Sequence, residues 1–233
     1  MDESAVCLGR LIPALFRSRI NKFLAEVELG GKVCLVHVPN TGRLNYTLTS
    51  GGRVWLRRVN RVGRTRHDIV LAEDKGFKVV VDSAIQNELV AKAVEHGVIA
   101  EFSAYKICGR EVVVGGSRLD FALCSDSQKY FLEVKGCTLA EQGYALYPDA
   151  PTARGRRHVG TLIRLVEEGF RGGVLFVALR GDVIGFKPNT AVDPSFSLEL
   201  LEAHRNGVDV LAYRVKVGHS CVKVERPIPL FLD

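Results

Sequence analysis

The sequence lacks the features that mark secreted, membrane-spanning and zinc-binding proteins. Its six cysteines contain no C-x-x-C pair and no zinc-ligand spacing, so we expect reduced, mostly buried thiols without a structural metal or a disulfide framework. The stretch Met1-Asp2-Glu3-Ser4 contains no basic run, and no long apolar run follows it. We therefore expect neither secretion nor a membrane partner, and the cytoplasm is the expected location.

Other absences narrow the possible functions. The chain has no internal repeat and no low-complexity tract, and it has no helix-turn-helix or zinc-finger pattern that would support sequence-specific DNA recognition. No nucleotide cofactor is expected. The composition is ordinary for a folded protein, because 47% of the 233 residues are apolar and 25% are charged. That length is enough for one large or two small domains that each bury a core.

Positive charge is concentrated in the first third of the chain. Residues 1–80 hold 14 Lys and Arg against 7 Asp and Glu, a net charge of +7, whereas residues 81–233 hold 18 against 19, a net charge of −1. This asymmetry indicates two domains with different roles, residues 1–81 and residues 82–233. A polyanion site and a solvated basic surface explain the excess equally well.

The first third has the pattern of a small β-barrel. The pair Gly30-Gly31, between two apolar stretches, predicts a two-residue hairpin turn. About five strands without an amphipathic helix are typical of an OB-fold-like barrel, a type that commonly binds nucleic acid. The predicted strands are residues 8–19, 23–29, 32–38, 53–59 and 67–71.

Basic residues lie where such a barrel could hold a phosphate backbone. Tyr46 and Trp55 lie among them, and a basic groove with interleaved aromatic residues binds single strands by charge neutralisation and base stacking. Trp55 stands between Val54 and Leu56, so we favour a core position for it over a stacking role. The candidate nucleic-acid-binding residues are Arg17, Arg19, Lys22, Arg43, Arg53, Arg57, Arg58 and Arg61.

After residue 81 the pattern becomes mixed α/β. A helix is predicted over residues 83–96, capped by Asp82 or Ser83 and followed by Gly97. The predicted order is α-β-β-β-α-β, then α-β-β. The other expected elements are strands at 111–114, 117–123, 129–136, 174–179, 210–217 and 221–224, helices at 152–168 and 194–206, and a loop at 144–149.

Three charged residues on two of these strands form the candidate catalytic site. Glu133 and Lys135 share one face of their strand because side chains alternate, and Asp120 would lie beside Glu133 on the neighbouring strand. Two converging carboxylates suit Mg²⁺ or Mn²⁺, with the Lys135 ammonium beside the ion. Solvated strand ends would give the same spacing, but the apolar residues around Glu133 favour a buried cluster or a metal site.

Further candidates follow along the chain. Asp149 could be a turn former or a site residue. Arg157 and His158 lie in the first turns of the predicted helix 152–168, where a phosphate would be favoured, although a solvated surface explains them equally well. We keep Asp149, Arg157 and His158 as accessory residues of the site.

The order of elements resembles the PD-(D/E)XK restriction-endonuclease-like fold, with the carboxylate on the second strand and Glu-x-Lys on the third. The wider chain resembles the sugar fermentation stimulation protein family, which joins an N-terminal OB-type domain to a C-terminal nuclease-like domain. The expected fold class is therefore mixed α/β with these two parts. The matching stretches are residues 22–27, 37–43, 117–121, 133–135, 147–158 and 212–214.

The resemblance implies DNA binding without sequence preference and a link to sugar metabolism, notably that of maltose. It also implies that Asp120, Glu133 and the carbonyl of Val134 are metal ligands and that Lys135 is the catalytic cation. The first helix of this fold often adds an acidic ligand. The family's acidic pair corresponds to Ala91 and Lys92 here, which leaves Glu88 or Glu95 as weaker candidates. The chain also departs from the family at Val38, Leu44 and Ala153.

Three functions remain open at this stage. The first is a sequence-nonspecific DNA-binding protein with a nuclease-like metal site. The second is an active nuclease that uses Mg²⁺ or Mn²⁺ to hydrolyse DNA or structured RNA. The third is an inactive scaffold or transcriptional co-regulator. The sequence does not predict the oligomeric state.

Overall fold

The N-terminal part folds as a closed five-stranded barrel in the computed structural model, which describes residues 2–60 and 63–232. The strand order is β4-β3-β2-β5-β6, and a parallel bridge between β4 and β6 closes the barrel. This is the OB topology that we predicted. The strands are β2 (Leu11–Asn21), β3 (Leu24–Leu29), β4 (Lys32–His37), β5 (Arg53–Arg58) and β6 (His67–Asp74).

Alternation of side chains builds the barrel core. Ala25 and Val27 of β3 are fully buried, while the glutamates between and beyond them face outward. Gly30 and Gly31 connect β3 to β4 with φ angles of 59° and 77°, the left-handed values that a two-residue hairpin turn requires. A further strand, β7 (Phe77–Val80), pairs with β6 and reaches the second domain through a hydrogen bond from Val80 N to Leu179 O.

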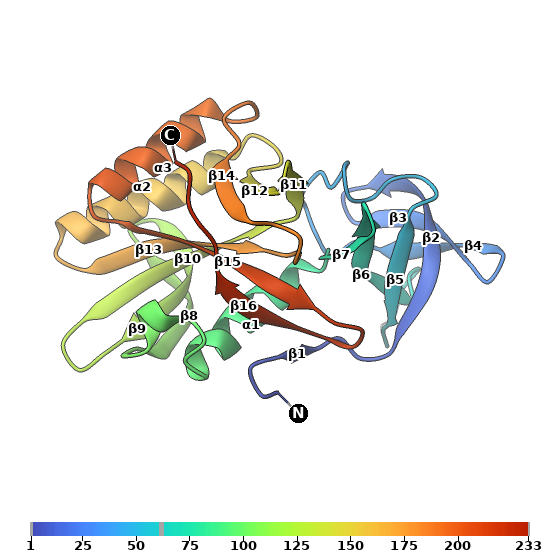
Figure 1. The fold of residues 1–233 in the computed structure, drawn as a ribbon, viewed down its shortest axis with the longest axis horizontal. Helices are drawn as coiled ribbons and strands as arrows, with labels where there is room; N and C mark the ends of the chain where they lie inside the picture. Colours follow the sequence, from blue (N-terminus) through green and yellow to red (C-terminus); the bar gives the residue numbers. More distant parts are fainter. Residues whose placement is uncertain (1, 61–62, 233) are drawn as a thin grey trace.

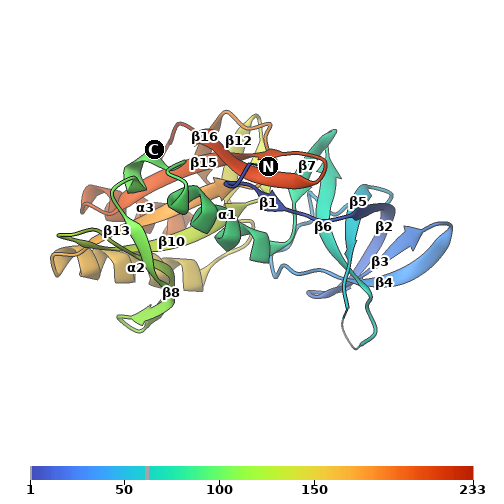
Figure 2. The same cartoon turned by 90° about the horizontal axis from the view of Figure 1, so that it is seen from below.

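The C-terminal part is built on a seven-stranded sheet in the order β1-β16-β15-β13-β10-β9-β8 (Figure 1). Its core elements follow the predicted order α-β-β-β-α-β, then α-β-β. Figure 2 shows the barrel at one end of the molecule, next to β7. The strands are β1 (Val6–Cys7), β8 (Lys106–Val114), β9 (Ser117–Cys124), β10 (Lys129–Cys137), β13 (Arg171–Ala178), β15 (Asp209–Val217) and β16 (Cys221–Pro227).

Helices cover both faces of this sheet. One core contains α1 (Ser83–Glu95), and the other contains α2 (Ala153–Glu167) and α3 (Pro194–Arg205). A short 3-10 helix, η1, covers Ala100–Phe102. Each helix begins where the sequence predicts, because the side chains of Asp82, Thr152 and Asp193 accept the first free backbone N–H groups. None of the helices in the described part is long and apolar enough to cross a membrane.

Two features of the C-terminal part differ from the prediction. The expected loop at 144–149 instead begins as a strand of a small sheet, because its hydrogen-bond partners lie far away in the sequence. That sheet consists of β11 (Leu139–Glu141), β12 (Tyr144–Tyr147) and β14 (Gly185–Pro188). The first residues also leave the barrel, because Val6 and Cys7 pair with β16 at the edge of the larger sheet.

The expectation of reduced, mostly buried cysteines was wrong. Cys108 and Cys124 form a disulfide between β8 and β9, two neighbouring strands whose register the sequence spacing does not reveal. Of the free thiols, those of Cys7 and Cys221 are exposed and only Cys137 is buried. Burial raises the pKa of the Cys137 thiol, which keeps it protonated and unreactive.

Candidate active site

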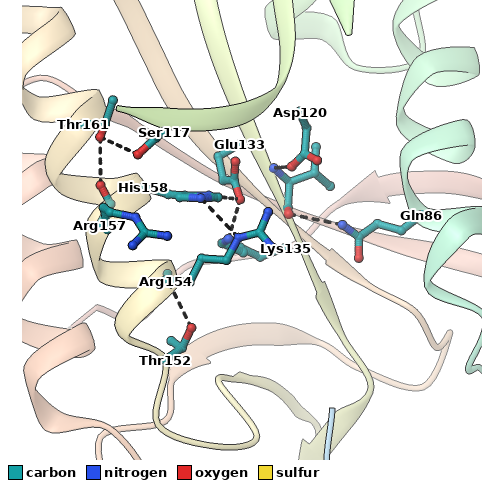
Figure 3. A network of polar contacts seen from close by, with 12 residues as sticks. Gln86, Ser117, Asp120, Glu133, Lys135, Thr152, Arg154, Arg157, His158 and Thr161 are labelled. Atoms are coloured by element: carbon teal, nitrogen blue, oxygen red, sulfur yellow. Dashed lines mark hydrogen bonds and ion pairs between the residues drawn. The ribbon is translucent and has the colours of Figure 1, made fainter. Parts of the chain in front are cut away.

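The candidate site lies where β9 and β10 separate. The two strands pair as far as Leu132 opposite Phe121, and the next residues along this register are Glu133 and Asp120. There Oδ2 of Asp120 accepts a hydrogen bond from Val134 N at 2.8 Å, so a carboxylate takes the place of a ladder carbonyl. The two acidic side chains therefore lie at the point where the strands diverge, with Glu133 on the side of His158 and Asp120 on the side of Gln86 (Figure 3).

Glu133 is a buried carboxylate with two nitrogen partners. Its side chain is 4% exposed, and its Oε1 contacts both Lys135 Nζ and His158 Nδ1, the latter at 2.5 Å. Burial alone would raise the pKa of Glu133, but the hydrogen bond with His158 and the charge of Lys135 outweigh it, so that pKa is lowered. Its Oε2 is also buried, and it has no hydrogen-bond partner among the residues that the structure describes.

Asp120 lies in a different electrostatic environment. Burial, and then the charge of Glu133, raise the pKa of Asp120 against the hydrogen bonds from Val134 N and Asn87. The Asn87 amide donates to Oδ1 at 2.8 Å. The two carboxylates therefore have pKa values shifted in opposite directions, a pattern common at sites that handle protons or metal ions.

Helix α1 supplies amides to the site and no acid. Gln86 Nε2 donates to the carbonyl of Val134 at 3.2 Å, and Asn87 contacts Asp120. Glu88 is exposed, which corrects the expectation that it adds an acidic ligand. Successive side chains on a helix point about 100° apart, so Glu88 points away from the site that the preceding residue, Asn87, faces. The sequence signal for these contacts was the pair Gln86 and Asn87, two side-chain amides that directly follow the buried Ile85.

His158 reaches Glu133 from α2. It is 2% exposed, its Nδ1 lies 2.5 Å from Glu133 Oε1, and its Nε2 accepts a hydrogen bond from Arg154 Nε at 3.4 Å. Arg157 is exposed, and its carbonyl accepts a hydrogen bond from the Thr161 hydroxyl at 2.9 Å. The sequence correctly predicted that His158 lies on this helix, but it did not predict the contact with Glu133.

A cleft of about 620 Å³ runs between the barrel and the α/β domain. Lys135 lines it from β10, and Lys22 and Arg43 line it from the barrel. Asp149 lines it as well, and its Oδ2 accepts a hydrogen bond from Leu44 N at 3.3 Å, which ties the 148–149 turn to the barrel. Asp120 borders a separate cavity of about 420 Å³ with Asn87 and Arg110.

Two of the predicted nucleic-acid-binding residues make contacts that hold the fold together. Arg19 donates to four backbone carbonyls, those of residues 22, 40, 42 and 43, and so fixes the loop after β4. Arg57 bonds Asp82, the cap of α1, at 2.6 Å. Trp55 is half-buried against the C-terminal core and lies outside the barrel core in which we expected it, and Lys78 Nζ lies over its ring at 5.0 Å.

The remaining predicted basic residues lie at the surface. Arg17 forms an ion pair with Glu28, and Arg53 lies 3.5 Å from Glu73. Lys22, Arg43 and Arg58 are exposed. Arg61 lies outside the described residues.

The donor set fits a small divalent cation that keeps part of its water. Within the described residues, no group of three or more His, Cys, Asp or Glu side chains converges. The two carboxylates and the Val134 carbonyl are nevertheless oxygen donors of the kind that Mg²⁺ and Mn²⁺ prefer. The unpartnered Oε2 of Glu133 is a buried lone-pair donor that such an ion would satisfy.

An OB-type barrel joined to an α/β domain with carboxylates on its second and third core strands defines a two-domain protein with a nuclease-like fold. Comparisons with known proteins agree. The model "SfsA N-terminal OB domain" matches residues 18–81, and the model "Sugar fermentation stimulation protein RE domain" matches residues 84–220. The chain belongs to the sugar fermentation stimulation protein family.

Individual relatives match over nearly the whole chain. Sugar fermentation stimulation protein homologs of Desulforamulus reducens and Alkaliphilus metalliredigens are 37% and 38% identical to it. The alignments cover 97% and 96% of this chain and 95% and 97% of theirs. A solved structure described as Pyrococcus furiosus SfsA in complex with Ca²⁺ superposes with a TM-score of 0.91, at 30% identity, over 97% of this chain and 98% of that one.

Proposed function

We propose that the protein binds DNA through its phosphates, without sequence preference, and holds Mg²⁺ or Mn²⁺ between Asp120 and Glu133 beside the bound strand. The observation that carries the proposal is the buried, unpartnered Oε2 of Glu133, a carboxylate that its neighbours keep ionised. An ionised oxygen in that position is costly unless a cation or donor satisfies it. The Ca²⁺ complex of the related protein supports a divalent cation here.

The chain's own residues would complete such a site. Asp120, Glu133 and the carbonyl of Val134 would hold the ion, and Asn87 and Gln86 orient two of these groups by their hydrogen bonds. His158 and Lys135 fix the orientation of the Glu133 carboxylate through Oε1, and Oε2 would be the atom that ligates the ion. The polar contacts around Glu133 thus restrict it to one orientation before any ligand arrives.

DNA binding rests on exposed cations at the cleft and on the barrel. Lys22 and Arg43 line the cleft, and within the described residues no carboxylate pairs with either side chain. Phosphate contacts of this kind carry no sequence information, which accounts for nonspecific binding. We place the family's link to sugar metabolism, and any role in transcription, at this DNA-binding step in the cytoplasm.

A salt titration tests the DNA-binding proposal. Affinity for duplexes of two unrelated sequences should fall log-linearly with salt, by a slope of about −0.9 per phosphate contacted, and should differ little between them. The variants Lys22→Ala and Arg43→Ala should each reduce that slope by about one contact. Arg205→Ala, at the end of α3 away from the barrel, is the surface control (Figure 1). Binding that is insensitive to salt would overturn the proposal.

Phosphodiester hydrolysis is the second candidate function, favoured by the position of Lys135 at the cleft wall. A bound cation would polarise a phosphate and lower the pKa of a water molecule. Lys135 could then stabilise charge that develops on the phosphate. A cleavage assay on single-stranded, duplex and flapped DNA and on structured RNA, with Mg²⁺ or Mn²⁺, tests this candidate. Activity that Glu133→Ala and Lys135→Ala both abolish supports catalysis, whereas no cleavage of any substrate supports binding alone.

A further inference from the structure

Two adjoining cavities form one groove between the barrel and the α/β domain. The cleft of about 620 Å³ that contains Lys135 shares Arg43, Leu44 and Asp149 with a neighbouring cavity of about 400 Å³. Each cavity has the volume of a pocket for a small ligand, so together they suit a short length of extended chain. We refer to the two cavities together as the interdomain groove.

Cations line both cavities of the groove. Lys22 and Lys135 line the larger cavity, Lys75 lines the smaller one, and Arg43 lines both. Lys22, Arg43 and Lys75 are exposed, and over residues 2–60 and 63–232 none of the three forms an ion pair. By contrast, Arg17 and Arg53 on the outer barrel surface are paired with glutamates.

Two carboxylates also border the groove, and one of them is already engaged. Asp149 accepts a hydrogen bond from Leu44 N and interacts electrostatically with Arg19. Glu141 lies at the edge of the second cavity and is exposed. The cations therefore outnumber the acidic groups along the groove wall, which favours a polyanion.

Tyr46 is the residue that favours a single strand over a duplex as the ligand. Its side chain lines the second cavity and remains 68% exposed, an unusual state for an aromatic side chain. No ring or cation contact involves Tyr46 in the described part of the chain. An exposed ring beside spaced cations is how proteins stack an unpaired base, because the faces of bases in a duplex are already covered by their neighbours.

The groove is also held in place before any ligand binds. Arg19 fixes the loop that carries Arg43 by its four carbonyl contacts, and Asn40 Nδ2 bonds the carbonyl of Val81 at 2.8 Å. Across the domains, Arg180 bonds Asp74 at the end of β6 at 2.6 Å. A preformed groove lowers the cost of ordering a flexible strand.

We propose that the interdomain groove binds single-stranded DNA, with a base stacked on Tyr46 and the backbone passing Lys75, Arg43 and Lys22 toward Lys135. The proposal rests on the proposed DNA binding and names its substrate class. It predicts that the protein prefers a single strand, or the unpaired arm of a flap, to a blunt duplex. The preference follows from the exposed ring of Tyr46, which can stack on an unpaired base.

Fluorescence anisotropy with a labelled oligothymidine and a blunt hairpin duplex of matched length tests the proposal, in EDTA so that no strand is cut. Tyr46→Ala should weaken binding of the single strand by about 5- to 150-fold, the range of one stacked base, while Tyr46→Phe keeps the ring and the affinity. Duplex affinity should be the same in all three proteins.

The salt dependence of binding tests the phosphate contacts proposed for Arg43 and Lys75. Replacing either by Ala should reduce the salt slope for the single strand by about 0.7, whereas Arg43→Lys and the distant Arg205→Ala should keep it. Equal single-strand affinity in the parent and in Tyr46→Ala overturns the groove proposal while leaving DNA binding intact. A parent protein that binds neither DNA overturns the proposed function itself.

Discussion

Glu133 stays ionised in a buried position because Lys135 and His158 both contact its Oε1. Removing this charge leaves the ammonium of Lys135 buried without its anion. We predict that Glu133→Gln lowers the free energy of unfolding by about 3–5 kcal/mol in urea denaturation at pH 7. The double variant Glu133→Gln/Lys135→Met should recover part of the loss, because it removes both charges. Additive losses would contradict a coupled pair.

The pKa of Asp120 is raised by folding, whereas that of Glu133 is lowered, so the two residues affect stability in opposite ways as the pH changes. A carboxyl with a pKa raised by folding stabilises the protein fully below its unfolded pKa and loses that contribution as the pH rises through its folded pKa. Asp120→Asn cannot ionise. In urea unfolding from pH 3.5 to 7 with EDTA, the stability of the variant relative to the parent should therefore increase with pH. A relative stability that falls over this range would show that the carboxylate is favoured.

The site residues differ in how well sequence reasoning could find them. Alternation along one strand predicts that Glu133 and Lys135 share a face, because that relation is local. The contact between His158 and Glu133 depends on how α2 packs against the sheet, which no local pattern reports. Arg19 and Arg57 show the same limit, since their acceptors lie elsewhere in the sequence or across the domain boundary.

At the scale of single elements, the first turn of α2 positions His158. Thr152 caps this helix by accepting from Gly155 N at 3.0 Å. We predict that Thr152→Ala costs about 1 kcal/mol of unfolding free energy, whereas Thr152→Ser, which keeps the hydroxyl, costs much less. Thermal unfolding of the two variants beside the parent measures the difference. Equal melting temperatures for Ala and Ser would show that the cap is not made.

Elements were predictable where their signals are local. The cap at Asp82, the start of α3 at Pro194 and the turn at Gly30-Gly31 lie where the sequence predicts them. The strands β1, β12 and β14 could not be predicted in the same way, because they are two to four residues long and depend on distant partners. These segments therefore become strands because they pair with the sheet, and their own residue composition does not specify it.

At the scale of the whole molecule, Arg180 joins the two domains. Its guanidinium is 1% exposed and contacts Asp74 of the barrel and Asp182 at 2.6 and 2.7 Å. We predict that Arg180→Met costs about 3–5 kcal/mol, because two carboxylates lose their counter-charge, and that calorimetry then resolves two transitions in place of one. Arg171→Ala removes an exposed pair with Asp209 and should cost less than about 1 kcal/mol. A single unchanged transition in Arg180→Met would contradict this role.

The two-domain architecture was predictable because charge and periodicity both change near residue 81. The groove between the domains was not, because its walls come from many separate parts of the chain. The proposed function depends on that assembly, because the barrel supplies exposed cations and the α/β domain supplies the candidate metal site. In that proposal, the same assembly brings Lys135 within reach of a strand held by the barrel.

The most direct test of the cation site is a calorimetric titration with Mn²⁺ in the absence of DNA. The parent should bind Mn²⁺ at one site that both Asp120→Asn and Glu133→Gln remove. Glu88→Gln, which changes an exposed carboxylate on α1, should bind as the parent does. Circular dichroism of each variant checks that the fold is retained. Undiminished Mn²⁺ binding in Asp120→Asn and Glu133→Gln would contradict the cation site on which the proposed function depends.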